Sequence, residues 1–162
     1  MTAFTAWRFE ELDGAREAVT VLKNAQSDGL VKIVDHAVLT WPVGEDQPKT
    51  EHSHDDPKRG AAWGALWGVL AGALFMVPIV GGVVGVAIGA LSKATEGSGI
   101  TKEDLERIRT EVVPGTSALF LVTENADFDR LGERFRVGPH TLISTNLTDD
   151  ERAFMLETFG GK

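Results

Sequence analysis

The chain has 162 residues, contains no cysteine and carries a formal net charge of -8 at pH 7. The lack of cysteine excludes disulfides, thiolate zinc sites and cysteine nucleophiles. The acidic charge repels phosphates and so argues against a nucleic-acid partner. The length fits one domain of ordinary size, and the first ten residues show no secretory signal, so we expect the polar part of the protein in the cytoplasm.

A first β-α-β unit is predicted before residue 42. Residues 5–9 read as a strand, and residues 30–41 read as a second, β-branched strand that ends at Pro42. Between them, apolar residues at helical spacing predict a helix that ends near Ser27 and is stopped by Asp28-Gly29; they are Leu12, Ala15, Val19 and Leu22.

Residues 43–59 combine prolines with many charges and predict a mobile loop. Within it, His52 and His54 stand among carboxylates, a pattern typical of a zinc, nickel or copper site. The alternative interpretation is a solvated loop without metal. A metal-binding sensor that works through His52 and His54 is therefore a remote alternative function.

The segment from Gly60 to Ser92 carries no charged residue. Its glycines recur every fourth position on both sides of Pro78, at Gly60, Gly64, Gly68 and Gly72 and again at Gly81, Gly85 and Gly89. Residues four apart lie on one side of an α-helix, so the glycines form a groove that lets backbones approach closely. The spacing predicts a glycine-zipper helical hairpin over residues 60–93, with Pro78 at its bend and the glycines in helix packing and oligomerisation.

The lengths of the two arms favour a hairpin over a single span. Residues 60–77 would form a helix of about 27 Å and residues 79–92 one of about 21 Å, against a bilayer core of about 30 Å. The bend at residues 77–82 is apolar, which favours a tip buried in lipid or against other protomers. The basic flanks Lys58, Arg59 and Lys93 lie at the open end and predict that both ends face the cytoplasm.

Trp63 and Trp67 are spaced by four residues near that same end. They are candidates for the membrane interface, where indoles gather. The alternative is that both indoles fill core space.

The remaining residues predict a second β-α-β unit preceded by a helix. Leu105, Ile108 and Val112 share one face of a helix over 101–112, and residues 117–123 are apolar on both faces and predict a central strand. Further elements are a helix over 128–135, a strand over 140–144 and a closing helix over 149–159 with Ala153, Phe154 and Leu156 inward; Thr148 and Glu151 have capping-box spacing.

Two such units predict an α+β fold of the ferredoxin-like kind, a duplicated β-α-β antiparallel sheet with helices on one face. The polar domain is then discontinuous, formed by residues 1–59 and 94–162, with the hairpin of residues 60–93 inserted. His36 and His140 fall in predicted strands far apart in sequence, and nothing pairs them with a nucleophile. We therefore expect no catalytic residues, no enzyme activity and no cofactor.

Three motifs carry a resemblance that covers nearly the whole chain: Gly60 to Gly68, Pro114 to Phe120 and Ser144 to Glu151. With the β-α-β order, the chain resembles a bacterial and archaeal family of predicted membrane proteins of unknown function, in which a ferredoxin-like domain carries a glycine-rich hydrophobic insert. The resemblance implies membrane or assembly behaviour and no known reaction.

These observations favour a non-enzymatic, self-assembling interaction or structural protein. Its partners would be its own copies and the lipid bilayer, and it would be anchored through the hairpin at a bacterial inner membrane with the polar domain facing the cytoplasm. The alternative is a soluble cytoplasmic homo-oligomer, a ring or shell with the zippers packed together around lipid or a partner.

Overall fold

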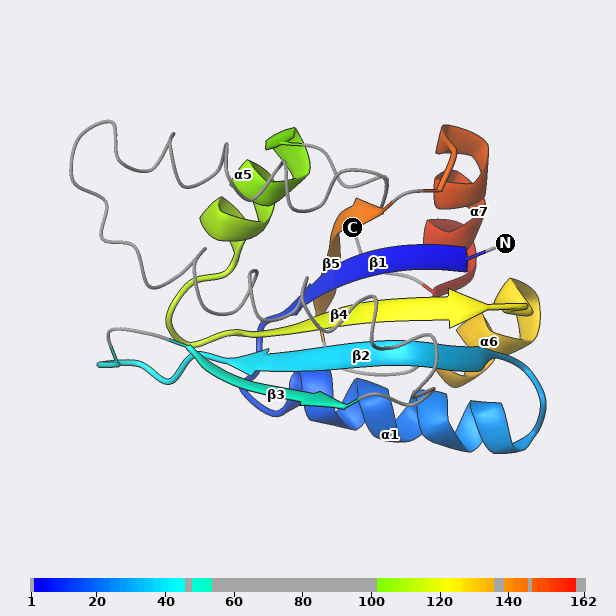
Figure 1. Ribbon diagram of the computed structural model, residues 1–162, viewed down its shortest axis with the longest axis horizontal. Coiled ribbons are helices and arrows are strands. Elements are labelled where there is room, and N and C mark those ends of the chain that lie inside the picture. Colours follow the sequence, from blue (N-terminus) through cyan, green and yellow to red (C-terminus); the bar gives the residue numbers. More distant parts are fainter. Residues whose placement is uncertain (1, 46–47, 54–101, 136–138, 146, 160–162) are drawn as a thin grey trace.

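A five-stranded antiparallel sheet forms the centre of the computed structural model, which describes residues 2–45, 48–53, 102–135, 139–145 and 147–159 (Figure 1). The elements follow one another as β1 (Thr2–Phe9), α1 (Gly14–Ser27), β2 (Lys32–Thr40), β3 (Lys49–Ser53), α5 (Lys102–Glu111), β4 (Ser117–Glu124), α6 (Phe128–Arg134), β5 (His140–Thr145) and α7 (Asp149–Phe159). The strand order is β3-β2-β4-β1-β5. The expected α+β class is therefore confirmed.

The strand β4 lies at the middle of the sheet, between β2 and β1. It pairs antiparallel with both neighbours, so that Phe120 stands opposite Ala6 of β1 and Ala37 of β2. Residues 117–123 are all buried, as an apolar run on both faces predicts. Because β1 and β2 each run antiparallel to β4, they are parallel to each other, and α1 makes the crossover between them.

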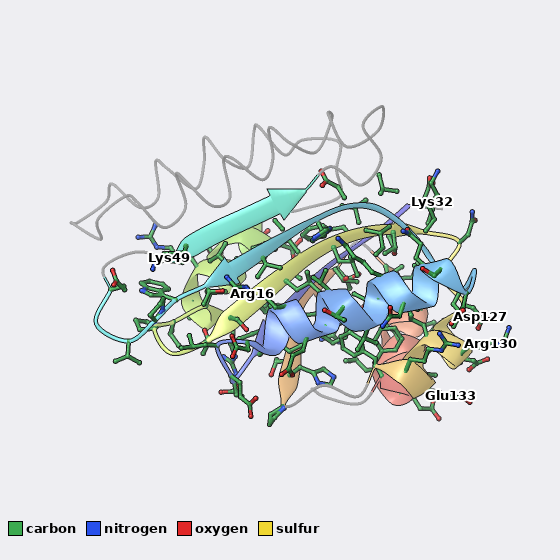
Figure 2. All side chains as sticks on the ribbon, turned by 90° about the horizontal axis from the view of Figure 1, so that it is seen from below. Arg16, Lys32, Lys49, Asp127, Arg130 and Glu133 are labelled. Carbon is green, nitrogen blue, oxygen red and sulfur yellow. The ribbon has the colours of Figure 1, made fainter. Side chains whose placement is uncertain are left out.

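We call the sheet face that carries Trp7, Phe9 and Leu119 the first face. The helices α1, α6 and α7 cover it, and α1 runs along the strands (Figures 1 and 2). The indole of Trp7 lies 5.6 Å from the ring of Phe135 and stacks at 5.9 Å on the ring of Phe159. The main core therefore forms between the first face and these three helices.

The start and end of α1 are fixed by specific hydrogen bonds. Ser117 of β4 is fully buried; its Oγ accepts from the Ala15 backbone N–H and donates to the Glu11 carbonyl. At the other end Gly29 has a φ of 78° and donates to the Gln26 carbonyl, and Leu30 donates to the Ala25 carbonyl. This is a Schellman motif, and it explains why Asp28-Gly29 stops the helix.

The second face of the sheet carries the residues that alternate with those of the first face, among them Phe4, Ala6, Leu39, Phe120 and Val122. The helix α5 does not share the first-face core, since the buried residues Ile108 of α5 and Val112 just after it lie outside that cluster. Arg8, which follows Phe4 and Ala6 in alternation, instead reaches the end of α5 at Glu111. The expectation that all helices cover one face was therefore wrong.

Two further local predictions were wrong. Residues 49–53, expected within a mobile loop, form β3 at the edge of the sheet, paired with β2 from Thr40 to His36. An edge strand has only one neighbour and needs no apolar side chains, so its charged sequence disguised it. In α7, Ala153 and Phe154 are exposed and Leu156 is half-buried, whereas Met155 and Phe159 face the core.

The predicted capping box before α7 is confirmed. The Glu151 backbone N–H donates to Thr148 Oγ1 at 3.3 Å, and the Thr148 N–H donates to Glu151 Oε2 at 2.9 Å. Each bond satisfies a backbone donor that the first turn of a helix leaves without a partner. The helix α7 thus begins where the sequence places it.

Replacing Thr148 by alanine should lower the free energy of unfolding by about 1 kcal/mol, because the Glu151 N–H loses its acceptor. Thr148→Ser keeps the hydroxyl and should stay close to the parent. Urea unfolding followed by tryptophan fluorescence measures both variants. A serine variant as unstable as the alanine variant would show that the hydroxyl contributes little.

Candidate interaction surface

The second face is the described surface next to the two ends of the apolar segment. On one side of the segment the chain leaves β3 at Ser53, and on the other side it enters α5 at Lys102. The glycines of the predicted hairpin, Pro78, and the flanking Lys58, Arg59, Trp63, Trp67 and Lys93 lie outside the described residues. Their roles in packing, the bend and the membrane interface stay predictions.

The second face is apolar and almost free of solvent contact. The exposed fraction is 0% for Phe4, Ala6, Leu39 and Val122 and 1% for Phe120. The ring of Phe120 is flanked by the small side chains Ala6 and Ala37 on the neighbouring strands. A bulky side chain between two small ones gives a change in side-chain size against which another element can pack closely.

A buried carboxylate interrupts this apolar surface. Asp35 has an exposed fraction of 0%, and it is the only buried acid among the residues whose burial the structure describes. It follows a bulge in β2, where the register to β4 shifts between Ile33 and Asp35. Its Oδ1 accepts from the His36 backbone N–H at 2.9 Å, which compensates part of the loss of water.

The helix α5 is attached to the sheet by arginines at two points. Arg8 Nη1 of β1 donates to Glu111 Oε2 at 2.6 Å, and Arg8 Nη2 pairs with Glu10 at 2.9 Å. Arg107 Nη1 donates at 3.3 Å to the carbonyl of Ile143, the extra residue where the register of β5 to β1 shifts. These contacts place α5 over the β5 and β1 side of the second face.

The turn before β4 is hydrogen-bonded to Trp41, the residue that follows the end of β2. Gly115 has a φ of 91°, which favours glycine, and its N–H donates to the Trp41 carbonyl at 2.6 Å. The Trp41 N–H in turn donates to the carbonyl of Thr116. The Pro114-Gly115 turn therefore fixes the register of β2 against β4 at the end of the sheet where β4 begins.

The candidate metal residues are only partly described. His52 lies on β3 opposite Ala37, and His54 lies outside the described residues. Within the ranges that the structure describes, no group of three or more histidine, cysteine, aspartate or glutamate residues could hold a metal ion. The predicted pair His52 and His54 stays a prediction.

The two strand histidines lie in different parts of the sheet. His36 is buried in β2, whereas His140 begins β5, with β4 and β1 between them. The imidazole of His140 lies edge-on to Phe135 at 5.3 Å and to Trp7 at 5.6 Å. His140 therefore belongs to the aromatic part of the first-face core, a contact that no sequence spacing indicated.

The described helices are short: α1, at 14 residues, is longer than α5, α6 and α7. Of the helices in the described part of the chain, none is long and apolar enough to cross a membrane.

If the second face is a true core surface, Phe120→Ala should lower the free energy of unfolding by about 3–5 kcal/mol through lost burial and a cavity. Phe154 is 43% exposed on α7 and provides the matched control. Phe154→Ala should cost less than about 1 kcal/mol. Equal losses in urea unfolding for the two phenylalanines would contradict this assignment.

Comparison with known protein families gives a match that covers more than half of the chain. A family model with the description "Protein of unknown function (DUF1269)" matches residues 61–160. The matched range starts at the second residue of the apolar segment and continues through α5, β4, α6, β5 and α7. No curated protein and no solved structure matches the chain.

Proposed function

We propose that this chain, which belongs to the DUF1269 family of proteins of unknown function, is a non-catalytic interaction protein that associates with membranes and with its own copies through residues 60–92. The observation that carries the proposal is the uncharged run from Gly60 to Ser92 with glycine at every fourth position in each arm. The family match includes nearly all of this run, so it belongs to the part of the chain that the family shares. Such a run gains stability from lipid or from close helix packing.

The positions of β3 and α5 support a hairpin with both ends on one side of a membrane. Both elements belong to the same packed unit, since β3 pairs with β2 and α5 is bound to β1 and β5. A folded polar unit does not lie across a bilayer core, so the segment between them enters and leaves on the same side. Lys58, Arg59 and Lys93 favour the cytoplasmic side.

The order of elements supports the finer fold assignment. The units β1-α1-β2 and β4-α6-β5 each place a strand of the other unit between their own two strands. Such split β-α-β units are the building blocks of the ferredoxin-like plan. We propose this plan for the polar domain, with β3 and α5 added around the inserted segment.

Membrane association predicts that the untagged protein, at native expression, stays in the membrane pellet after a carbonate wash, because the apolar run partitions into lipid. Gly68→Leu and the matched control Ala65→Leu keep the run apolar and should also pellet.

In detergent, Gly68→Leu should fall to a lower mass by light scattering because the leucine blocks the close approach of helices, and Ala65→Leu should keep the mass of the parent.

A parent protein found wholly in the soluble fraction would exclude the membrane role. A large detergent-free soluble particle would then favour the alternative, a cytoplasmic ring or shell. An unchanged mass of Gly68→Leu would contradict assembly through the glycine groove.

The one-sided hairpin predicts equal labelling of two cysteines placed on either side of the segment. Because the chain has no cysteine, Glu45→Cys and Glu106→Cys each supply a single thiol at an exposed position. Both should react with a membrane-impermeant maleimide in inverted inner-membrane vesicles and stay unlabelled in intact spheroplasts. Labelling on opposite sides would contradict the hairpin, and labelling of both from outside would reverse its orientation.

A further inference from the structure

We propose that the second face is the docking surface for residues 60–92 of the same chain. One side of the hairpin lies on the sheet around Phe120, and the other side remains for lipid or a further copy. This docking does not depend on the proposed membrane role.

The helix α5 alone cannot account for the burial of the second face. Its ten residues form a helix about 15 Å long and about 10 Å wide, attached at β1 and β5. Leu39 lies on β2, which is separated from β5 by two strands and hence by about 14 Å. Leu39 is nevertheless 0% exposed. Another element is therefore needed over β2 and β4.

The chain leaves and re-enters the described unit at opposite edges of the sheet. It leaves at Ser53 on the β3 edge, opposite His36, and returns at Lys102 into α5 near the β5 edge. The intervening residues must pass from one edge of the sheet to the other, over about 19 Å. The first face is occupied by α1, α6 and α7, so the free route runs across the second face.

Residues 60–92 match the second face in size and in chemistry. The arms of residues 60–77 and 79–92 would be about 27 Å and 21 Å long as helices and together about 20 Å wide. The strands β2 and β4, of nine and eight residues, are about 26–30 Å long. Around Phe120 the second face is apolar, and its charged side chains there are Asp35 and Arg8, of which Arg8 is paired with Glu10 and Glu111. The glycine groove of the arms would accept the ring of Phe120, which stands between Ala6 and Ala37.

The same chain is a better occupant than a second copy. The polar residues 54–59 and 94–101 are long enough to connect the hairpin to both edges, since six extended residues span about 20 Å. A segment of the same chain is present at a high effective concentration. A separate chain would have to reach that concentration in solution to compete with it. A second copy is instead an outcome that the experiment detects.

Neighbouring residues of β2 provide matched probes, because Leu39 lies on the second face and Val38 on the first. In the intact full chain, purified in detergent and diluted to a monomer, Leu39→Cys should react with a maleimide at least about 100-fold more slowly than Glu106→Cys, as expected of a buried position. Val38→Cys should be equally protected under its helices. Leu39→Cys reacting as fast as Glu106→Cys would show an open second face and overturn the proposal.

Cross-linking identifies the occupant. Leu39→Cys is combined with single cysteines placed in turn at residues 61–76 and 79–91 and exposed to a mild oxidant. We expect disulfides within one chain at positions three or four residues apart, read as a change in mobility without a change in mass. Val38→Cys, on the other face, should form none. Disulfides only between two chains would assign the face to a second copy, and none at any position would reject the segment as occupant. The result does not depend on lipid, so the proposed membrane role can fail while this inference stands.

Discussion

The burial of β4 on both faces is the constraint on which the rest of this structure depends. From Ser117 to Thr123 every residue of this strand is buried. Burying one large apolar side chain contributes about 1.5–3 kcal/mol, so the sheet is stable only when both of its faces are covered. Three short helices cover the first face, and the second face needs more than α5.

Specific hydrogen bonds attach helices to each of the two faces of the sheet. Ser117 at the start of β4 places the beginning of α1 on the first face, through bonds to Ala15 and Glu11. On the other side, Arg8 and Arg107 attach α5 through its last turn and through the carbonyl of Ile143. The glycine segment enters the chain between β3 and α5, so its position in the sequence coincides with the layer that is incomplete.

The sequence predicted most elements because their periodicity was strong, and it failed where periodicity carries no information. The strand β3 is polar and has one neighbour, so no alternation marks it. Of the stripe predicted from Leu105, Ile108 and Val112, the last two are buried as expected, yet a stripe does not tell which face of a sheet it will meet. In α7 four consecutive apolar residues, 153–156, allow several inward faces, and contact with Trp7 selects the one that carries Phe159. The candidate surface itself, an alternation on three strands, becomes visible only once their register is known.

The position of β1 has a consequence for how the chain is made. Its two neighbours, β4 and β5, are both encoded after the apolar segment, so β1 has no strand to pair with until residue 117 has left the ribosome. Until then only β2 and β3 can pair, and a two-stranded hairpin is marginally stable in water. The 33 uncharged residues from 60 to 92 therefore emerge before any sheet exists to receive them. During synthesis they face whatever apolar environment is at hand, which makes the order of translation itself a determinant of whether the nascent chain meets lipid or its own domain first.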